Sequence, residues 1–377
     1  MRASNGTKPY HWRDLATQLW VMREAGVRVA SAGIRHLDRH FRLERVGDHA
    51  GLLTDAFSGA DVDAIADGRG AVVAEARAML AGPEPRDQPG DHCATPFACG
   101  FSAWCGRDVP AGPQWPIREL PHSGKAVAAT CAAQGIDDLT DLPPGQLKNA
   151  LHERIRAATV SGEAYHDGAK ARALMAGWAY PRIYLDFETV QHAIPRWIGT
   201  GPYQQIPFQF SAHIEQGDGA MRHEGFLSID GSDPRPGIAA ALAMLPGEGA
   251  VIAWHASFEK SRLHELADQV PEHGPALRSL ADRLVDLKPV ARASWYHRDQ
   301  RGSFSIKYVL PTIAPELDYD GLVEVKQGGD AVAAWHEAAD PATSPARIAA
   351  IRAALEAYCE RDTWAMVVVL RRLAGEG

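Results

Sequence analysis

The chain has 377 residues, which exceeds the usual size of a single hydrophobic core and predicts at least two domains. Hydrophobic residues make up 46% and charged residues 23%, as in globular proteins, and no apolar run reaches the roughly 18 residues that a membrane span needs. The formal net charge of -8 excludes a generic basic coat protein of nucleic acids, but not an enzyme that gathers carboxylates around metal ions. The N-terminus lacks an apolar signal core, so we predict a cytoplasmic protein without membrane partners.

The first part of the chain predicts a small mixture of helices and one strand. Residues 9–25 have the apolar spacing of a helix, and Gly26 follows as a stop signal. The segment 27–38 is typical of a strand with polar interruptions, and 58–82 is a second helical stretch. Glycine and proline then mark 82–91 as a loop.

From residue 181 the pattern changes to strands and helices in alternation, after a connector of short helices and turns over 110–180. The predicted elements are, in order, strands at 182–188, 205–214 and 223–229, a helix at 234–245, a strand at 249–256, a helix at 257–267 and a last helix at 344–373. Three successive strands followed by an α/β half predict a mixed sheet flanked by helices.

The strand RIYLDFET carries two acidic residues where a buried strand would be apolar. Side chains alternate along a strand, so Asp186 and Glu188 share the face opposite to Leu185 and Phe187. Two neighbouring carboxylates raise each other's pKa unless a cation or water separates them. The alternative interpretation is an edge strand with one solvated face.

A third acid, Glu259, lies in the first turn of the helix that follows the strand GAVIAWHA. Ligands collect at strand ends of open α/β sheets, so this position suits a site residue. Alternatively, Glu259 only favours the positive end of the helix dipole. Asp286, in LVDLKPV, is a further candidate acid whose direction the pattern leaves open.

The last helix places Tyr358 and Asp362 four residues apart, which stacks a phenol and a carboxylate on one face. The residues after Asp362 are almost wholly apolar, and a buried aspartate is costly unless it is paired or binds a metal. An exposed aspartate at a boundary is the alternative. Hard oxygen ligands suit Mg²⁺ or Mn²⁺, and two such ions can activate water and stabilise the leaving oxygen in phosphodiester cleavage.

The three motifs DFET, HASFE and Tyr358-x3-Asp362 resemble the DEDD exonucleases of the RNase H-like superfamily, in the branch whose third motif contains tyrosine. The resemblance implies that two metal ions are bound by Asp186, Glu188, Glu259 and Asp362, and that Tyr358 orients the attacking water. The second motif of that family usually ends in aspartate, whereas this chain has the longer Glu259.

Residues 181–313 are also similar to the bacterial domain of unknown function 2779 family, on YLDFETV, IPRWIGTGPYQQIPFQFS, HASFEKSRLHELA, LVDLKPV and GSFSIKYVLP. Members commonly carry an N-terminal module similar to RecB-type and CRISPR-type iron–sulfur nucleases, a restriction-endonuclease-like α+β fold. Residues 9–37 resemble the end of that module, with Gln18 on its glutamine helix. Arg2 stands where the catalytic lysine would fall and no residue matches the glutamate, so we expect a truncated or degenerate remnant without its own active site.

Three of the five cysteines, Cys93, Cys99 and Cys105, form a C-x5-C-x5-C cluster. The resemblance implies that this trio belonged to a [4Fe-4S] cluster, whose fourth ligand would come from the N-terminus of a complete module. Cys131 or His92 could substitute for it. The alternatives are zinc held with His92, whose usual cysteine pairs are closer in sequence, and three reduced cysteines without metal.

Between Arg283 and Lys307 the chain has six basic residues against two acidic ones, with aromatic residues interleaved. Cations contact phosphates and aromatic rings stack on bases, so we expect this segment to bind single-stranded 3′ ends of DNA or RNA. The candidate substrate-binding residues are Lys307, Arg298, Arg301 and Trp295, with Lys307 as the first choice for a phosphate contact. A solvated loop is the alternative.

Together these patterns predict three regions: a RecB-like remnant with the cysteine cluster (1–108), a helical connector (109–180) and an RNase H-like exonuclease domain (181–377). The predicted function is a metal-dependent 3′–5′ exonuclease that hydrolyses phosphodiester bonds by a two-metal mechanism. The preference for DNA depends only on analogy with the N-terminal module, and RNA is nearly as well supported. Two rival functions are a catalytically silent nucleic-acid-binding subunit and a protein-interaction adaptor on the same fold.

Overall fold

The computed structural model describes residues 4–317, 321–322 and 324–376 and contains two compact units. One consists of Met1–Ala111 and Gln191–Gln204, and the other of Gly112–Val190 and Gln205–Gly377. Arg2 lies outside the described residues, so the expectation for the lost catalytic lysine stays at the level of the sequence. None of the described helices has the length and apolar character that crossing a bilayer requires.

The first unit has a small core between two helices. Its elements are α1 (Pro9–Glu24), β1 (Gly33–Leu37), β2 (Leu53–Phe57), α2 (Ala60–Asp67), α3 (Arg69–Ala81), η1 (Asp91–Ala94) and α4 (Ser102–Cys105), with β1 and β2 antiparallel. Ala16 and Leu19 of α1 pack against Val62 and Ala66 of α2. The predicted first helix is confirmed, whereas the second divides at Gly68, a residue with low helix propensity.

The connector region packs against a segment that lies far away in the sequence. It contains η2 (Ile117–Glu119), α5 (Gly124–Ala132), η3 (Leu139–Asp141), α6 (Ala150–Ser161), β3 (Tyr165–His166) and α7 (Gly168–Met175). Tyr296 and Phe304 are buried in its core, and β3 pairs with β9 (Trp295–Tyr296). Except for 109–111, the residues predicted as a connector therefore belong to the second unit.

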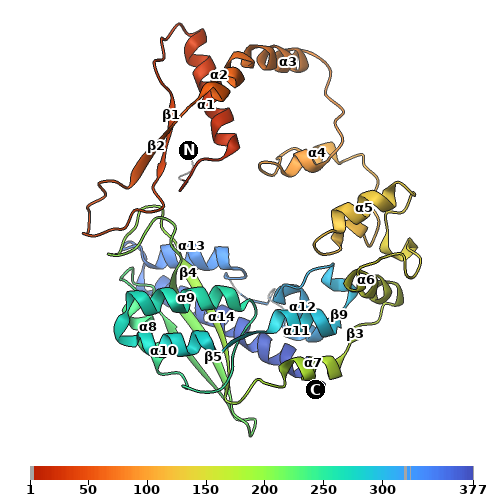
Figure 1. Cartoon of the computed structure of the whole chain (residues 1–377), viewed down its shortest axis with the longest axis vertical. Coiled ribbons are helices and arrows are strands. Elements are labelled where there is room, and N and C mark those ends of the chain that lie inside the picture. Colours follow the sequence, from red (N-terminus) through yellow and green to blue (C-terminus); the bar gives the residue numbers. More distant parts are fainter. Residues whose placement is uncertain (1–3, 318–320, 323, 377) are drawn as a thin grey trace. The chain divides into compact units, whose positions relative to one another are not determined.

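A mixed sheet of five strands organises the second unit (Figure 1). Its strands are β4 (Arg182–Val190), β5 (Ile206–Glu215), β6 (Met221–Leu227), β7 (Val251–Ala253) and β8 (Leu284–Asp286), in the order β6-β5-β4-β7-β8. The first three are antiparallel neighbours, whereas β7 and β8 run parallel to β4. The predicted mixed α/β architecture is confirmed, and β4 lies in the middle of the sheet.

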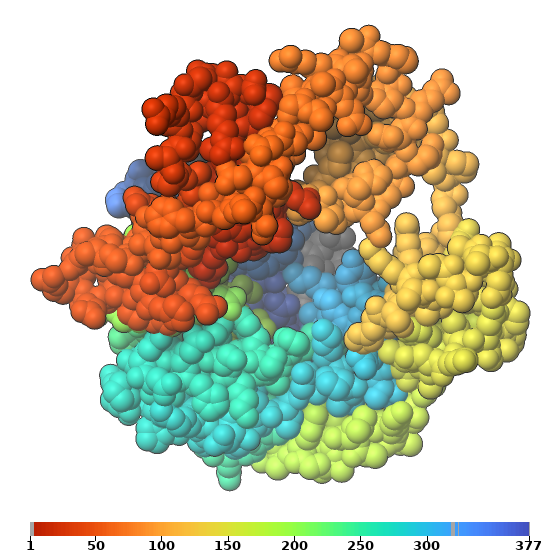
Figure 2. Space-filling model, turned by 45° about the horizontal axis from the view of Figure 1, so that its top comes forward, coloured from red at the N-terminus to blue at the C-terminus, as the bar shows by residue number. Residues whose placement is uncertain are grey.

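One face of the sheet is covered by α8 (Arg235–Ala243), α9 (Ala256–Gln269) and α10 (Gly274–Asp282). Ile183, Leu185 and Phe187 of β4 point into this apolar layer and are at most 4% exposed. The three helices form a continuous surface, coloured teal in the space-filling view (Figure 2). This apolar layer contributes to the stability of the unit through the hydrophobic effect.

The other face is crossed by the long helix α14 (Pro345–Ala374), which contacts both β4 and β5 (Figure 1). The remaining elements are α11 (Leu287–Ser294), η5 (Arg298–Gln300), α12 (Ile306–Ile313), η6 (Pro315–Leu317) and α13 (Gly328–Ala338). Ser344 caps the N-terminus of α14 by accepting a hydrogen bond from the Arg347 amide, and Gly375 ends the helix in the left-handed conformation. Ser344 and Gly375 therefore set the two ends of α14.

Candidate active site

Three carboxylates meet between β4 and α14. Asp186 and Glu188 project from the face of β4 that α14 covers, and Asp362 projects from α14, with ligand oxygens of all three within 4.8 Å of one another. Glu188 and Asp362 are each 8% exposed. The alternative of a solvated edge strand is wrong, since β4 has hydrogen-bonded neighbours on both sides.

The surroundings of these acids favour their protonated forms. Burial, followed by the charges of Asp362 and Glu188, raises the pKa of Asp186 well above its usual value. Burial and the Asp362 charge raise the pKa of Glu188 to about 8, against the opposing charge of Lys307. Three carboxylates this close can all ionise at neutral pH only where positive charge is added.

Tyr358 and Lys307 form the polar border of this acid group. The Lys307 ammonium donates to the Tyr358 hydroxyl at 3.1 Å and to the Lys326 carbonyl at 2.8 Å, and it lies 5.1 Å from the centre of the Tyr358 ring. Burial and the Asp362 charge raise the pKa of Tyr358, so its hydroxyl stays protonated. The structure thus brings Lys307, predicted as a phosphate contact, together with the acids.

Glu259 lies in the first turn of α9 and outside the group of three acids. It is 4% exposed, and its Oε2 has no hydrogen-bond partner among the described residues. Burial, followed by the charge of Asp286, raises the pKa of Glu259 to about 7, while its own backbone amide acts in the opposite direction. Its charge in turn raises the pKa of Asp186, so the two carboxylates are electrostatic neighbours.

Asp286 ends β8 and caps α11, since its Oδ1 accepts a hydrogen bond from the Lys288 amide at 3.0 Å. Burial raises its pKa, and the charge of His255 acts in the opposite direction. The Asp286 carboxylate thus stabilises the N-terminus of α11. Its charge nevertheless reaches Glu259, which gives the site a second pair of acids.

The prediction for Trp295 as a stacking platform is corrected by the structure. Its side chain is 3% exposed, and its indole N–H donates to Thr312 Oγ1 at 3.1 Å. A base has no free face of this ring to stack on. The count of aromatic residues between Arg283 and Lys307 did not distinguish rings that face solvent from rings that fill a core.

Arg298 and Arg301 contact the connector. Arg301 donates to the Gln114 carbonyl at 2.6 Å and to Glu119 at 2.9 Å, and its guanidinium lies 4.8 Å from the centre of the Trp115 ring. Arg298 lies 5.4 Å from the same ring. Part of the predicted basic surface therefore holds the connector in place.

The cysteine cluster lies within 91–105, with Cys93 in η1, Cys99 in the next loop and Cys105 at the end of α4. All three thiols are free, and Cys99 is exposed. In the described part of the chain, the acids of β4 and α14 are the one group of three metal-ligating side chains with ligand atoms within 4.8 Å of one another, and the zinc alternative for the cysteines stays a prediction. Cys131 is buried in the connector core, and the iron–sulfur cluster stays a prediction.

Sequence reasoning missed a polar seam between β5 and α14. Gln209, Ser211, His213 and Glu215 alternate along β5 on the face towards α14, and all are at most 5% exposed. Thr363, next to Asp362, has its hydroxyl 2.7 Å from Ser211 Oγ and 2.8 Å from His213 Nδ1. The alternation in IPFQFSAHIE was the available signal, although it predicts a solvated face equally well.

Two further contacts extend this seam. Glu215 accepts a hydrogen bond from the Tyr184 hydroxyl and another from Arg371, both at 2.7 Å. Burial and the neighbouring His223 lower the pKa of His213 to about 4, so its ring is neutral at pH 7. These polar pairs join β5 and β4 to α14 next to Asp362.

Comparison with known protein families matches residues 183–305 to the family described as Domain of unknown function (DUF2779). The match covers about a third of the chain and confirms the resemblance to this family for that segment. No curated protein and no solved structure matches the chain.

Proposed function

We propose that the DUF2779 segment and the elements packed on it form a metal-dependent nuclease, a 3′–5′ exonuclease that hydrolyses phosphodiester bonds. The observation that carries the proposal is the close group of three carboxylates on a central strand and the last helix, of which Glu188 and Asp362 are buried and Asp186 is half-buried. A protein gains no stability from buried like charges, so such a group calls for a cation. The strand order, with three antiparallel strands beside two parallel ones, supports an RNase H-like sheet.

The residues present fit divalent metal ions. All the donors are carboxylate oxygens, the hard ligands that Mg²⁺ and Mn²⁺ prefer. Asp186, Glu188 and Asp362 would hold the metal, and the unpartnered Oε2 of Glu259 supports this residue as a further ligand or water-binding group. Two bound ions would supply activation of water and stabilisation of the leaving oxygen.

The neighbouring side chains have roles of their own in this proposal. The Tyr358 hydroxyl keeps its proton and can donate a hydrogen bond to orient a water molecule or a phosphate oxygen. Lys307 positions that hydroxyl and adds a positive charge where the substrate phosphate would lie. Burial of the surrounding β4 and α14 side chains restricts bulk water and strengthens these electrostatic interactions.

The substrate class follows from analogy rather than from a contact. A single-stranded 3′ end of DNA or RNA fits an exonuclease of the DEDD type, and the resemblance of 9–37 to RecB-type modules favours DNA. The same analogy carries the proposal that the N-terminal unit is related to these nuclease modules, with Cys93, Cys99 and Cys105 as ligands of a [4Fe-4S] cluster.

The test is degradation of 5′-labelled single-stranded DNA and RNA with Mn²⁺, Mg²⁺ or a chelator, using wild type, Asp186→Asn and the surface control Asp282→Asn. We expect a ladder that shortens from the 3′ end, is lost with chelator and in Asp186→Asn, and persists in Asp282→Asn. Intact labelled strands with folded protein and any divalent ion would contradict the proposal. If the inactive protein still binds the labelled strands, the catalytically silent nucleic-acid-binding subunit replaces the nuclease as the proposed function. If strand binding is absent or insensitive to salt, the protein-interaction adaptor replaces it.

A further inference from the structure

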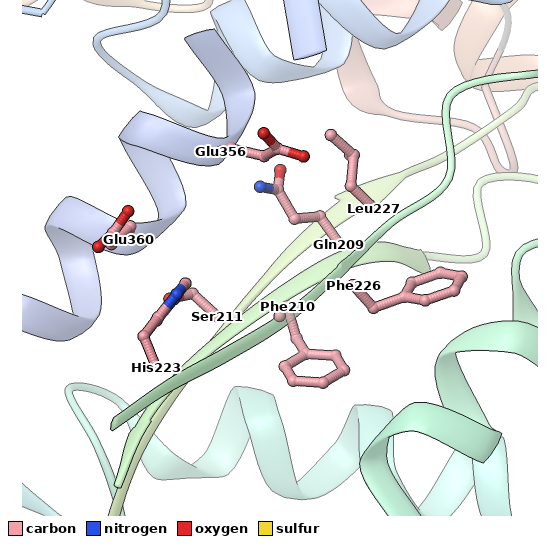
Figure 3. A pocket seen from close by; sticks show the side chains of 9 residues that line it. Gln209, Phe210, Ser211, His223, Phe226, Leu227, Glu356 and Glu360 are labelled. Atoms are coloured by element: carbon pink, nitrogen blue, oxygen red, sulfur yellow. The ribbon is translucent and has the colours of Figure 1, made fainter. Parts of the chain in front are cut away.

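A pocket of about 300 Å³ lies between β5, β6 and α14, apart from the three acids. Its polar lining residues are Gln209, Ser211, His223, Glu356 and Glu360, and the rest of the lining comes from β5 and β6. Figure 3 shows the two glutamates extending from α14, with the phenyl ring of Phe210 on the far side of the strand. The interior of the pocket is therefore polar at the helix and at the β5 side chains.

The groups that face this pocket are mostly hydrogen-bond acceptors. Gln209 is 2% exposed, and its Nε2 donates to the Leu355 carbonyl at 2.8 Å, which fixes the orientation of the amide. Its Oε1 has no hydrogen-bond partner among the described residues, and the amide points towards Glu356 in Figure 3. A buried carbonyl without a donor is unfavourable, and a ligand with N–H groups would supply the missing hydrogen bond.

The two glutamates add negative charge above this carbonyl. Glu356 and Glu360 are one turn apart on α14, about 200° around the helix axis from Tyr358, so they face away from the proposed catalytic acids. Arg352 lies 3.5 Å from Glu356 in an ion pair whose side chains are 46% and 55% exposed. Such an exposed pair is worth little, so it leaves Glu356 available to a better-placed cation.

The spacing of the acceptors in this pocket favours a guanidinium group over a single metal ion. Among the described residues, the pocket side chains His223, Glu356 and Glu360 do not form a group of three ligand atoms within 4.8 Å of one another, so their spacing does not favour a single metal ion. A guanidinium presents five N–H donors in one plane and can address an amide oxygen and two separate carboxylates together. Ser211 Oγ, 2.8 Å from His223 Nε2, completes the polar wall.

We propose that the pocket between β5, β6 and α14 binds a guanidinium group, with Gln209 Oε1 and the carboxylates of Glu356 and Glu360 as acceptors. The group belongs either to a small free molecule or to an arginine side chain of a peptide. This inference is independent of the proposed nuclease activity, since none of these three residues is among the proposed metal ligands.

The test is isothermal titration calorimetry of the full chain with ethylguanidinium and with the tripeptide amide Gly-Arg-Gly. We expect saturable binding of at least one probe, and about tenfold weaker binding of tetramethylammonium, which has a charge but no N–H donor. Binding of ethylguanidinium identifies the free group as sufficient, whereas binding of the peptide alone identifies an arginine side chain. Absence of saturable binding for both probes overturns the proposal.

Variants decide whether binding occurs in this pocket. Glu356→Gln/Glu360→Gln changes two exposed residues and should weaken the affinity at least about tenfold, whereas Glu272→Gln, an exposed control at η4, should leave it unchanged. Gln209→Leu should weaken binding as well, and the surface variants keep the test decisive if this buried change impairs folding. Equal affinity in wild type and the double variant overturns the proposal.

Discussion

The two faces of the central sheet differ in what they contribute. Towards α8, α9 and α10, β4 presents Ile183, Leu185 and Phe187 to an apolar layer. Towards α14, the alternate residues include Asp186 and Glu188, opposite Ser211 and Gln209 of β5. Both faces are buried, so burial alone does not distinguish them. A single strand can thus be stabilised by apolar packing on one face and carry destabilising acidic side chains on the other.

The largest expected effect is on activity, from the α14 face. Asp186→Asn should lower the rate of strand degradation by about a thousandfold, because it removes a proposed metal ligand whose charge acts at the reacting phosphate. Its free energy of unfolding without metal should stay the same or rise, since a neutral amide relieves repulsion by Glu188 and Asp362. Labelled-strand kinetics and urea denaturation measure the two quantities. Full activity in this variant would remove Asp186 from the site.

The apolar face should respond in the opposite way. Leu185→Ala removes a fully buried side chain and should lower the free energy of unfolding by about 3 kcal/mol. The protein that remains folded should keep near-normal activity per molecule, because the acids lie on the other side of β4. Urea denaturation and assays corrected for the folded fraction test this separation. A loss of less than about 1 kcal/mol would contradict the close packing of Leu185 in this layer.

The acids should make the metal-free protein less stable as pH rises. The pKa of Glu188 is raised from 4.5 to about 8, so the folded state retains a proton that the unfolded state has released. The resulting stability is fully present below pH 4.5 and is lost as the pH rises through about 8. Over this window wild type should lose about 5 kcal/mol more than Glu188→Gln, at about 1.4 kcal/mol for each pH unit. The measurement is urea denaturation of both metal-free proteins between pH 4.5 and 8. The same pH dependence of the free energy of unfolding in wild type and Glu188→Gln would contradict this prediction.

Tyr358→Phe should have a smaller effect on activity. The phenyl ring keeps the contact with Lys307, while the hydroxyl that orients water or phosphate is lost, so kcat should fall about tenfold. Tyr308→Phe is the matched control, because it removes the same hydroxyl group from a tyrosine of α12 that is 49% exposed. Equal kcat values for the two variants would make Tyr358 a structural residue.

The smallest effect is expected from a substitution in the polar seam between β5 and α14. Thr363→Val removes the hydroxyl between Ser211 and His213 and should lower the free energy of unfolding by about 1 kcal/mol. If the seam aims Asp362, the affinity for Mn²⁺ should fall as well. Calorimetric titration measures this affinity, and an unchanged value would separate the seam from the site.

Much of the fold could be predicted where one periodicity dominates. The segments 182–188 and 205–214 became β4 and β5, and the last helix at 344–373 became α14. The proximity of Asp186, Glu188 and Asp362 could be predicted only by combining strand alternation with a family resemblance. No local pattern relates residues so far apart in the sequence.

The remainder depended on tertiary contacts that a local pattern does not encode. Trp295 stands in a basic and aromatic segment, yet its ring packs inside the protein. Arg301 adds to the local positive charge but pairs with Glu119, which lies in the connector. The contact of Lys307 with Tyr358 joins α12 to α14, and neither helix alone indicates it.

The most direct measurement is the anomalous scattering of Mn²⁺ in crystals of the wild-type protein, with Asp186→Asn crystals as the matched control. We expect manganese density bounded by Asp186, Glu188 and Asp362 in wild type, and its loss or strong reduction in the variant. A wild-type crystal at neutral pH with Mn²⁺ in excess, with the three side chains ordered and no anomalous density between them, would contradict the central claim.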